Sequence, residues 1–193
     1  MSLNPDRLVF IGASTGGPGL IEYIIKKLIH INGSIIIAQH MDKLPLESFA
    51  SRLNRIGDVE VICAKDKKTI VENHKIYVLH DTSIISKDQN SKLYIEKSSD
   101  RGYYHPSIDH LLSSIALLND LKFVSVYILS GIGDDGTKGS LDIKNFLSKV
   151  KIIAQDEKSS KVYGMPRSVK EAGVCDKVCS IEEIVKEIER DTL

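Results

Sequence analysis

Short β-branched runs alternate with amphipathic segments along most of this chain of 193 residues. The strand-like runs occupy residues 7–12, 34–39, 75–79, 122–129 and 151–154. Other segments repeat their apolar residues at every third or fourth position, which predicts helices over residues 18–30, 46–56, 106–118 and 137–150. Strands separated by helices pair in parallel, and the connecting helices then cover both faces of the sheet. We therefore predict an α/β fold, with a doubly wound, mainly parallel sheet and helices on both faces.

The middle of the chain, residues 57–105, departs from this alternation. Residues 59–63 have the pattern of a strand, and residues 84–96 have the pattern of a polar hairpin with its turn at residues 88–90. Because the strands of a hairpin run antiparallel, we expect an antiparallel excursion in this part of the fold.

The chain contains no long linker, internal repeat or low-complexity segment. Ser180, followed three residues later by Glu183, predicts a capping box that starts a last helix ending near Arg190. We therefore expect a single domain spanning residues 1–193, with its core from about residue 7 to residue 189.

Equal numbers of basic and acidic residues, 26 of each, give the chain a net charge of zero. Nucleic-acid-binding proteins carry basic surfaces, so nucleic acid is not an expected partner. No apolar run approaches the roughly 18 residues of a membrane span, and the polar N-terminus lacks a signal-peptide core. The three cysteines are an odd number and argue against a disulfide framework. We expect a cytoplasmic protein that does not insert into membranes.

The first predicted strand runs into a glycine-rich turn, where Gly12, Ser14 and Gly16 have G-x-S-x-G spacing. Such a turn exposes the serine at the start of a helix, where developing negative charge is stabilised. Gly12 and Gly17 also have the spacing of a phosphate-binding loop, but Pro18 stands where that loop needs a lysine. The motif makes Ser14 a candidate nucleophile, and the alternative is a serine that only caps the helix.

Polar residues also follow two other predicted strands. His40 comes directly after the strand over 34–39, and the strand over 122–129 runs into a glycine-rich loop with Asp134 and Asp135. The carboxyl ends of parallel strands meet at one edge of the sheet, where a histidine could serve as base to a serine and an acid could orient it. A magnesium or phosphate loop, or a helix cap at Asp135, remains an alternative for the acids.

These strand ends and two further stretches resemble the catalytic domain of the chemotaxis methylesterase family, CheB. The matching segments are IGASTGGP at 11–18, QHM at 39–41, YHPSID at 104–109, LSGIGDDG at 129–136, AQDEKSS at 154–160 and GMP at 164–166. The resemblance runs from about Arg7 to Glu189 and implies a Rossmann-like serine hydrolase without cofactor or metal. The implied reaction removes methyl groups, as methanol, from glutamate γ-methyl esters on the cytoplasmic domains of chemoreceptors during adaptation in bacterial chemotaxis.

The resemblance also assigns roles to residues of this chain. Ser14 is the implied nucleophile, His40 the general base, and Asp135 the acid that orients His40. The backbone N–H of Thr15 is the first expected donor to the oxyanion, and that of Ile132 is the second. The chain order Ser, His, Asp differs from that of α/β-hydrolases, but such triads recur on unrelated folds with different orders.

The sequence departs from the family pattern at two places and at its N-terminus. The family usually has methionine at the position of Ile132. Residues 78–82 stand where the family usually has an Ala-Pro-x-x-x-His segment, and the proline and the later histidine of that segment are missing here. The residues before Arg7 are too few for a receiver domain of roughly 100 or more residues, so we expect the catalytic domain without a receiver domain.

Three alternatives to a methylesterase are compatible with these motifs. The same residues could act mainly on receptor glutamines, because a serine nucleophile can attack an amide as well as an ester. The chain could be a binding module of the same fold without catalytic turnover. A phosphate- or nucleotide-binding domain is the third alternative, and Pro18 argues against it.

Overall fold

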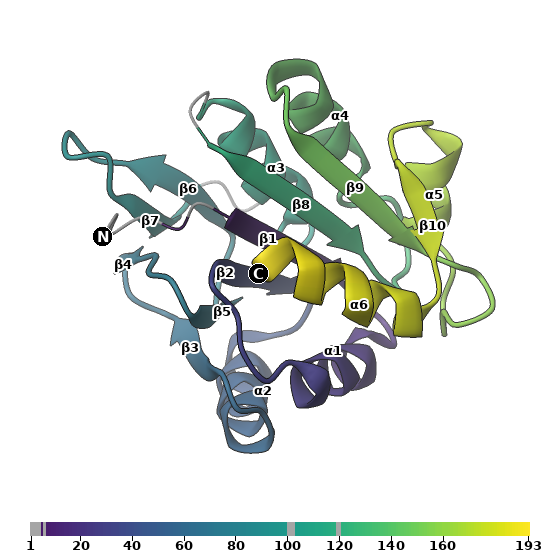
Figure 1. The fold of residues 1–193 in the computed structure, drawn as a ribbon, viewed down its shortest axis with the longest axis horizontal. Helices are drawn as coiled ribbons and strands as arrows, with labels where there is room; N and C mark the ends of the chain where they lie inside the picture. Colours follow the sequence, from purple (N-terminus) through teal and green to yellow (C-terminus); the bar gives the residue numbers. More distant parts are fainter. Residues whose placement is uncertain (1–4, 6, 100–102, 119–120) are drawn as a thin grey trace.

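The computed structural model describes residues 5, 7–99, 103–118 and 121–193, and a seven-stranded sheet forms its centre (Figure 1). The strands lie in the order β10-β9-β8-β1-β2-β5-β3, and every neighbouring pair is parallel. Their bounds are β1 Arg7–Ala13, β2 Ser34–Gln39, β3 Glu60–Ala64, β5 Lys75–Leu79, β8 Phe123–Ile128, β9 Val150–Gln155 and β10 Lys177–Cys179. The predicted strands over 34–39 and 75–79 are confirmed with the same bounds.

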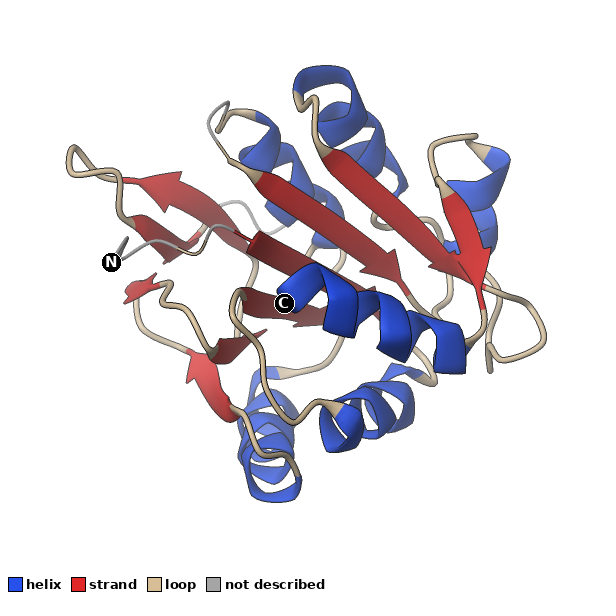
Figure 2. Cartoon of the chain, viewed as in Figure 1, coloured by secondary structure: helices blue, strands red, loops and turns tan. Residues whose placement is uncertain are grey.

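Helices cover both faces of this sheet (Figure 2). Helices α1, α2 and α6 pack on one face, and α3, α4 and α5 pack on the other. Their bounds are α1 Gly17–Lys27, α2 Lys43–Ile56, α3 Ile108–Ala116, α4 Thr137–Phe146, α5 Met165–Glu171 and α6 Ile181–Thr192. Alternate residues of β1 serve the two faces, Val9 and Ile11 on the first and Leu8 and Phe10 on the second. The predicted doubly wound fold is confirmed.

A smaller antiparallel sheet of three strands, in the order β4-β7-β6, joins the core on the α3 side. Its strands are β4 Lys68–Ile70, β6 Ser83–Lys87 and β7 Leu93–Lys97. The predicted antiparallel excursion and its hairpin are therefore confirmed. Strand β4 was not predicted, because three partly exposed residues are too short for a recognisable apolar pattern.

Some predicted helix ends are wrong for a physical reason. Helix α1 ends at Lys27 rather than at residue 30, because Leu28 is already extended although its side chain is buried. Leu147 ends α4 in the same way, so apolar periodicity continues past the end of each helix. The capping box of Ser180 and Glu183 is confirmed at the start of α6.

The sheet places the ends of β8, β1 and β2 side by side, with β1 between the other two. Strands β2, β5 and β3 lie on one side of β1, and β8, β9 and β10 lie on the other. A sheet of this kind leaves a crevice at the carboxyl ends of the strands where its order reverses. The residues after β1, β2 and β8 therefore share one edge of the sheet.

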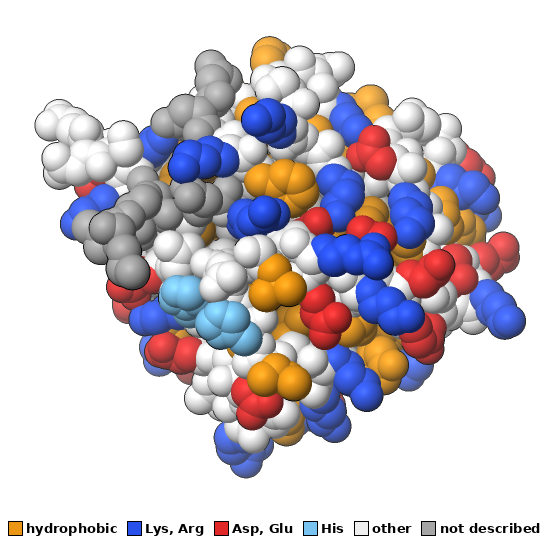
Figure 3. Space-filling model, in the orientation of Figure 1, with side chains coloured by type: hydrophobic (Ala, Val, Ile, Leu, Met, Phe, Trp, Pro, Cys, Tyr) orange, Lys and Arg blue, Asp and Glu red, His pale blue; other side chains and the backbone are white. Residues whose placement is uncertain are grey.

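One face of the protein mixes both signs of charge (Figure 3). Basic and acidic side chains are interspersed on the face drawn in Figure 3, as expected for a net charge of zero. Within the described part of the chain, every helix is too short or too polar to cross a membrane.

Candidate active site

The turn after β1 holds Ser14 at the crevice. The Ser14 N–H donates to the Ser130 carbonyl at 2.9 Å, and the Gly17 N–H donates to the Ser14 carbonyl at 2.8 Å. Gly16, with a φ of 87°, is the N-cap residue of α1, and no side chain caps this helix. The alternative that Ser14 caps the helix is therefore wrong. The tight turn leaves Ser14 in the lining of a surface pocket.

Gln39, the last residue of β2, is 1% exposed and ties this turn to the next residue of the site. Its side-chain amide donates to the Ser14 carbonyl at 3.0 Å and to the His40 carbonyl at 3.1 Å. A side chain at position 17 would collide with it, because a Cβ there would lie 2.3 Å from Oε1 of Gln39. Gln39 thus fixes the distance between the backbones of Ser14 and His40, a function that was not predicted from the sequence.

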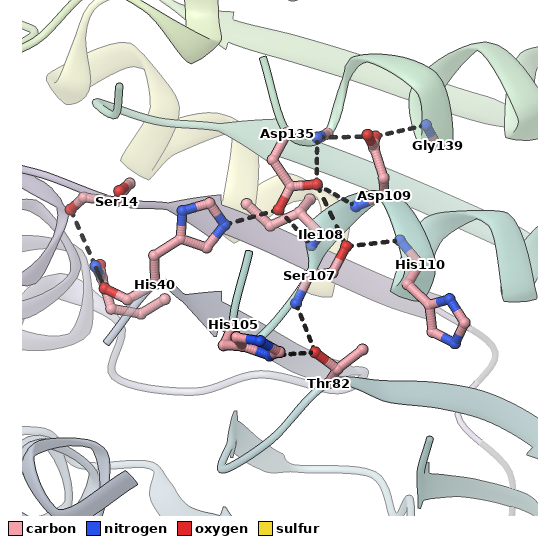
Figure 4. Close-up of polar contacts among 12 residues, drawn as sticks. Ser14, His40, Thr82, His105, Ser107, Ile108, Asp109, His110, Asp135 and Gly139 are labelled. Atoms are coloured by element: carbon pink, nitrogen blue, oxygen red, sulfur yellow. Dashed lines mark hydrogen bonds and ion pairs between the residues drawn. The ribbon is translucent and has the colours of Figure 1, made fainter. Parts of the chain in front are cut away.

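His40 and Asp135 form a hydrogen-bonded pair at the carboxyl edge of the sheet. Nε2 of His40 lies 2.7 Å from Oδ2 of Asp135, and the two side chains are 11% and 1% exposed. Figure 4 shows the imidazole between Ser14 and Asp135, with its other ring nitrogen on the side of Ser14. The sheet thus brings together side chains that are far apart in the sequence.

The carboxylate of Asp135 is held by the start of a neighbouring helix, α3. The Ile108 N–H donates to Oδ2 at 2.8 Å, and the Asp109 N–H donates to Oδ1 at 2.8 Å (Figure 4). The positive end of a helix dipole favours a carboxylate at this position. Helix α4, which follows Asp135, has Gly136 as its N-cap residue, so the alternative that Asp135 is the N-cap residue of this helix is wrong.

These same donors argue against the magnesium alternative. Asp135 faces backbone N–H groups and an imidazole, whereas a hard cation needs free oxygen ligands. Among the residues that the structure describes, no group of three or more His, Cys, Asp or Glu side chains could hold a metal ion.

Tyr104 stacks on the imidazole of His40, which the sequence analysis did not foresee. The two ring centroids are 4.9 Å apart and the rings are 7° from parallel. The phenol reaches the loop after β8, since a Cβ at Gly133 would lie 2.4 Å from its oxygen. Burial, and then Asp134 and Asp135, raise the pKa of Tyr104, so the phenol stays neutral at physiological pH. Tyr104 therefore restrains one face of the His40 ring.

Ser14 and His40 open on a pocket of about 530 Å³. Its lining residues are Ser14, Thr15, His40, Met41, Asp42, Tyr103, Tyr104, His105 and Ile132. The predicted oxyanion residues Thr15 and Ile132 both lie in this lining, and neither donates its N–H to a described residue. The Tyr103 and Ile132 side chains are 90% and 62% exposed and form an apolar rim.

The comparisons with known proteins concern almost the whole chain. The family model described as CheB methylesterase matches residues 9–188. The protein-glutamate methylesterase/protein-glutamine glutaminase of Bacillus subtilis (strain 168) is 33% identical over 186 residues, which are 94% of this chain and 51% of that relative. An enzyme of the same name, numbered 1, from Photobacterium profundum is 31% identical over 95% of this chain and 52% of its own length.

A solved structure agrees with these relatives. The crystal structure of the Thermotoga maritima CheB methylesterase catalytic domain superposes with a TM-score of 0.84 at 31% identity, covering 95% of this chain and 97% of that one. The chain spans about half the length of the curated relatives that it matches. With most of its residues matched by the family model, the chain belongs to the CheB methylesterase family.

Proposed function

We propose that this protein hydrolyses glutamate γ-methyl esters on the cytoplasmic domains of chemoreceptors, releasing methanol during adaptation in bacterial chemotaxis. The observation that carries the proposal is the partly buried His40–Asp135 hydrogen bond beside a pocket lined by Ser14. The names of the relatives point to the same reaction. A cytoplasmic location is part of this proposal, because its substrates are the cytoplasmic domains of receptors. The chain acts in this proposal as one catalytic domain, with its core between about residues 7 and 189.

The proposed reaction begins with the hydroxyl of Ser14. As its oxygen attacks the ester carbonyl, Nδ1 of His40 takes the proton, since Nε2 faces Asp135. The tetrahedral oxyanion accepts hydrogen bonds from the backbone N–H groups of Thr15 and Ile132. Methanol then leaves with the proton from His40, and a glutamyl ester on Ser14 remains.

The second half of the proposed reaction frees the enzyme. Water attacks the glutamyl ester while His40 takes one of its protons, and collapse of the intermediate returns that proton to Ser14. The receptor keeps a glutamate carboxylate. Asp135 stabilises the imidazolium in both halves, while the N–H groups of α3 hold the carboxylate in place.

Methanol release from methylated chemoreceptor membranes tests this function, and ammonia release from unmethylated receptors tests the amide alternative in parallel. The second assay is justified because both relatives bear the name glutaminase as well as methylesterase. We expect methanol from the esters. Ammonia without methanol would assign the chain to glutamine deamidation. The absence of both products would favour the non-catalytic binding module.

Replacing Tyr104 by leucine should lower kcat by about 5- to 30-fold, because the imidazolium that forms in the transition state loses an aromatic face. This range corresponds to a cation–π contribution of about 1–2 kcal/mol. Tyr104→Phe keeps the ring and should stay within about threefold of the parent. Steady-state hydrolysis of a small soluble ester measures both variants, and equal losses in the two would refute the stacking role.

Replacing the exposed Tyr103 by alanine should raise KM for methylated receptors by about 5- to 30-fold. An exposed aromatic side chain that becomes buried against a protein substrate contributes about 1–2 kcal/mol. A small soluble ester does not reach this rim, so its hydrolysis should not change. Tyr23→Ala, on helix α1 and outside the pocket lining, is the matched control. A parallel loss on both substrates would show that Tyr103 supports the pocket rather than the receptor contact.

A further inference from the structure

A second carboxylate, that of Asp109, lies in the first turn of α3 directly beside Asp135. The proposed chemistry does not use it. Its Oδ1 accepts the N–H of Gly136 at 2.9 Å and the N–H of Gly139 at 2.7 Å, and these two groups begin helix α4 (Figure 4). Its own backbone N–H donates to Oδ1 of Asp135. The two acids therefore cap each other's helices.

The reciprocal arrangement connects the proposed catalytic acid to two helices at once. Asp135 stands just before α4 and binds the start of α3, whereas Asp109 stands in α3 and binds the start of α4. The hydrogen bonds of Asp109 thus set the separation between the loop that carries Asp135 and the helix that holds its carboxylate.

Close packing holds α3 and the start of α4 near each other. A Cβ at Gly139 would lie 2.6 Å from Cβ of Leu112 and 2.8 Å from the Asp109 carbonyl oxygen. Gly136 has a φ of 98°, and a Cβ there would lie 2.8 Å from Cδ1 of Ile128. The α4 backbone is therefore pressed against α3, within reach of a short acidic side chain.

Position 109 is an unfavourable place for a carboxylate. The presence of one there argues that its hydrogen bonds to the start of α4 have a function. Burial raises the pKa of Asp109 to about 6, and the carboxylates of Asp135 and Asp134 act in the same direction. The N–H groups of Gly139 and Gly136 offset only part of this effect. Proximity of two carboxylates costs free energy that a neutral residue would avoid.

We propose that Asp109 is a positioning residue for the esterase reaction, which fixes the loop carrying Asp135 and thereby the His40–Asp135 hydrogen bond. This inference rests on the proposed function. Catalytic groups must be held within about 0.5 Å of their working geometry, and a displacement of about 1 Å can lower the rate about 100-fold. Without the acceptor at position 109, the Gly139 N–H loses its bond to Asp109, and the Gly136 N–H keeps only its 3.1 Å bond to Oδ1 of Asp135, so the loop is free to shift.

The test compares Asp109→Ala with Asp109→Asn on a small soluble ester and on methylated receptors. Asparagine keeps an acceptor oxygen, so we expect kcat within about threefold of the parent. Alanine removes the acceptor, so kcat should fall about 10- to 100-fold on both substrates with KM unchanged. An asparagine variant as slow as the alanine variant, or a loss confined to KM, would overturn the proposal.

A double-mutant cycle separates positioning of Asp135 from general support of the fold. In an Asp135→Asn background, Asp109→Ala should cost less than about threefold, because the orientation that it protects is already lost. An equal cost in both backgrounds would show a role independent of Asp135. Where the alanine variant does not fold, Asp109→Ser takes its place, with a side chain too short to reach both N–H groups.

A spectroscopic measurement keeps this inference separate from the proposed activity. The proton on Nε2 of His40 should give a downfield ¹H NMR resonance in the parent and in Asp109→Asn, and a shifted or exchange-broadened one in Asp109→Ala. This result is expected even if the receptor assay fails, which would refute the activity and leave the positioning role intact. An unchanged resonance in Asp109→Ala would overturn the role of Asp109 itself.

Discussion

Substitution of Ser14 by alanine is expected to abolish methanol release from methylated receptors, with a fall in kcat of at least about 10⁴-fold. No other side chain of the pocket lining can replace the nucleophile in the same place, because Ser14 sits at the turn set by Gly16 and the Ser130 carbonyl. Losses of about 10⁶-fold follow removal of the nucleophile in other serine hydrolases, and binding with oxyanion stabilisation accounts for the remaining activity.

The Ser14→Ala protein should otherwise resemble its parent. The turn is held by backbone hydrogen bonds and by the side chain of Gln39, all of which alanine leaves in place. Its unfolding midpoint in urea should therefore change little, so that lost activity reports lost chemistry. Ser51→Ala makes the same substitution at an exposed position of α2, and this variant should keep full activity. Methanol release by Ser14→Ala at more than about a tenth of the parent rate would reject the proposed nucleophile.

Most strands of the central sheet could be predicted because each is marked by its own residues and by those directly beside it. Strand β2 is bounded by a glycine on one side and a polar histidine on the other, and its residues are apolar between Ser34 and Gln39. The polar residues after β1, β2 and β8 were recognisable because a buried parallel strand has no structural need for them. The sequence could therefore indicate both the fold and the edge at which the candidate site lies.

Short elements and supporting contacts were not predictable in the same way. Helix α5 and strand β10 are seven and three residues long, and neither gives a full apolar period. Gln39 reaches the Ser14 carbonyl only after β1 and β2 pair, and Tyr104 meets His40 across more than sixty residues of chain. A glutamine at the end of an apolar run was the one signal available for Gln39. Tyr104 lay in a matching motif, but the motif does not reveal the stacking partner.

The role of Asp135 could also not be decided from the sequence alone. Asp135 was predicted from its place after β8, but its alternative role as the cap of α4 could not be decided from neighbouring residues. The decision depends on Ile108 and Asp109, which lie 27 and 26 positions earlier and donate to the carboxylate. Tertiary pairing of two helix starts therefore outweighs the local capping preference.

Replacement of Asp135 by asparagine is expected to lower kcat about 10³- to 10⁴-fold while the protein stays folded. A carboxylate accepts the proton on Nε2 of His40 and so leaves Nδ1 free to take the proton of Ser14. An amide at this position can donate to the ring, which favours the tautomer with the proton on Nδ1. That tautomer cannot act as base to the serine, and the imidazolium also loses its counter-charge.

The same substitution should also reduce stability, and the structure explains why. Both oxygens of Asp135 accept backbone N–H groups, so an amide nitrogen in either place faces a donor instead of an acceptor. Loss of such charge-assisted bonds costs about 1–3 kcal/mol of the free energy of unfolding, measurable by urea titration. Asp134→Asn is the matched control, because its exposed side chain makes the same change in charge one residue away.

The turnover of the folded variant distinguishes orientation of His40 from a mere loss of stability. Near-normal methanol release by folded Asp135→Asn would contradict the role of Asp135 in holding the imidazole towards Ser14.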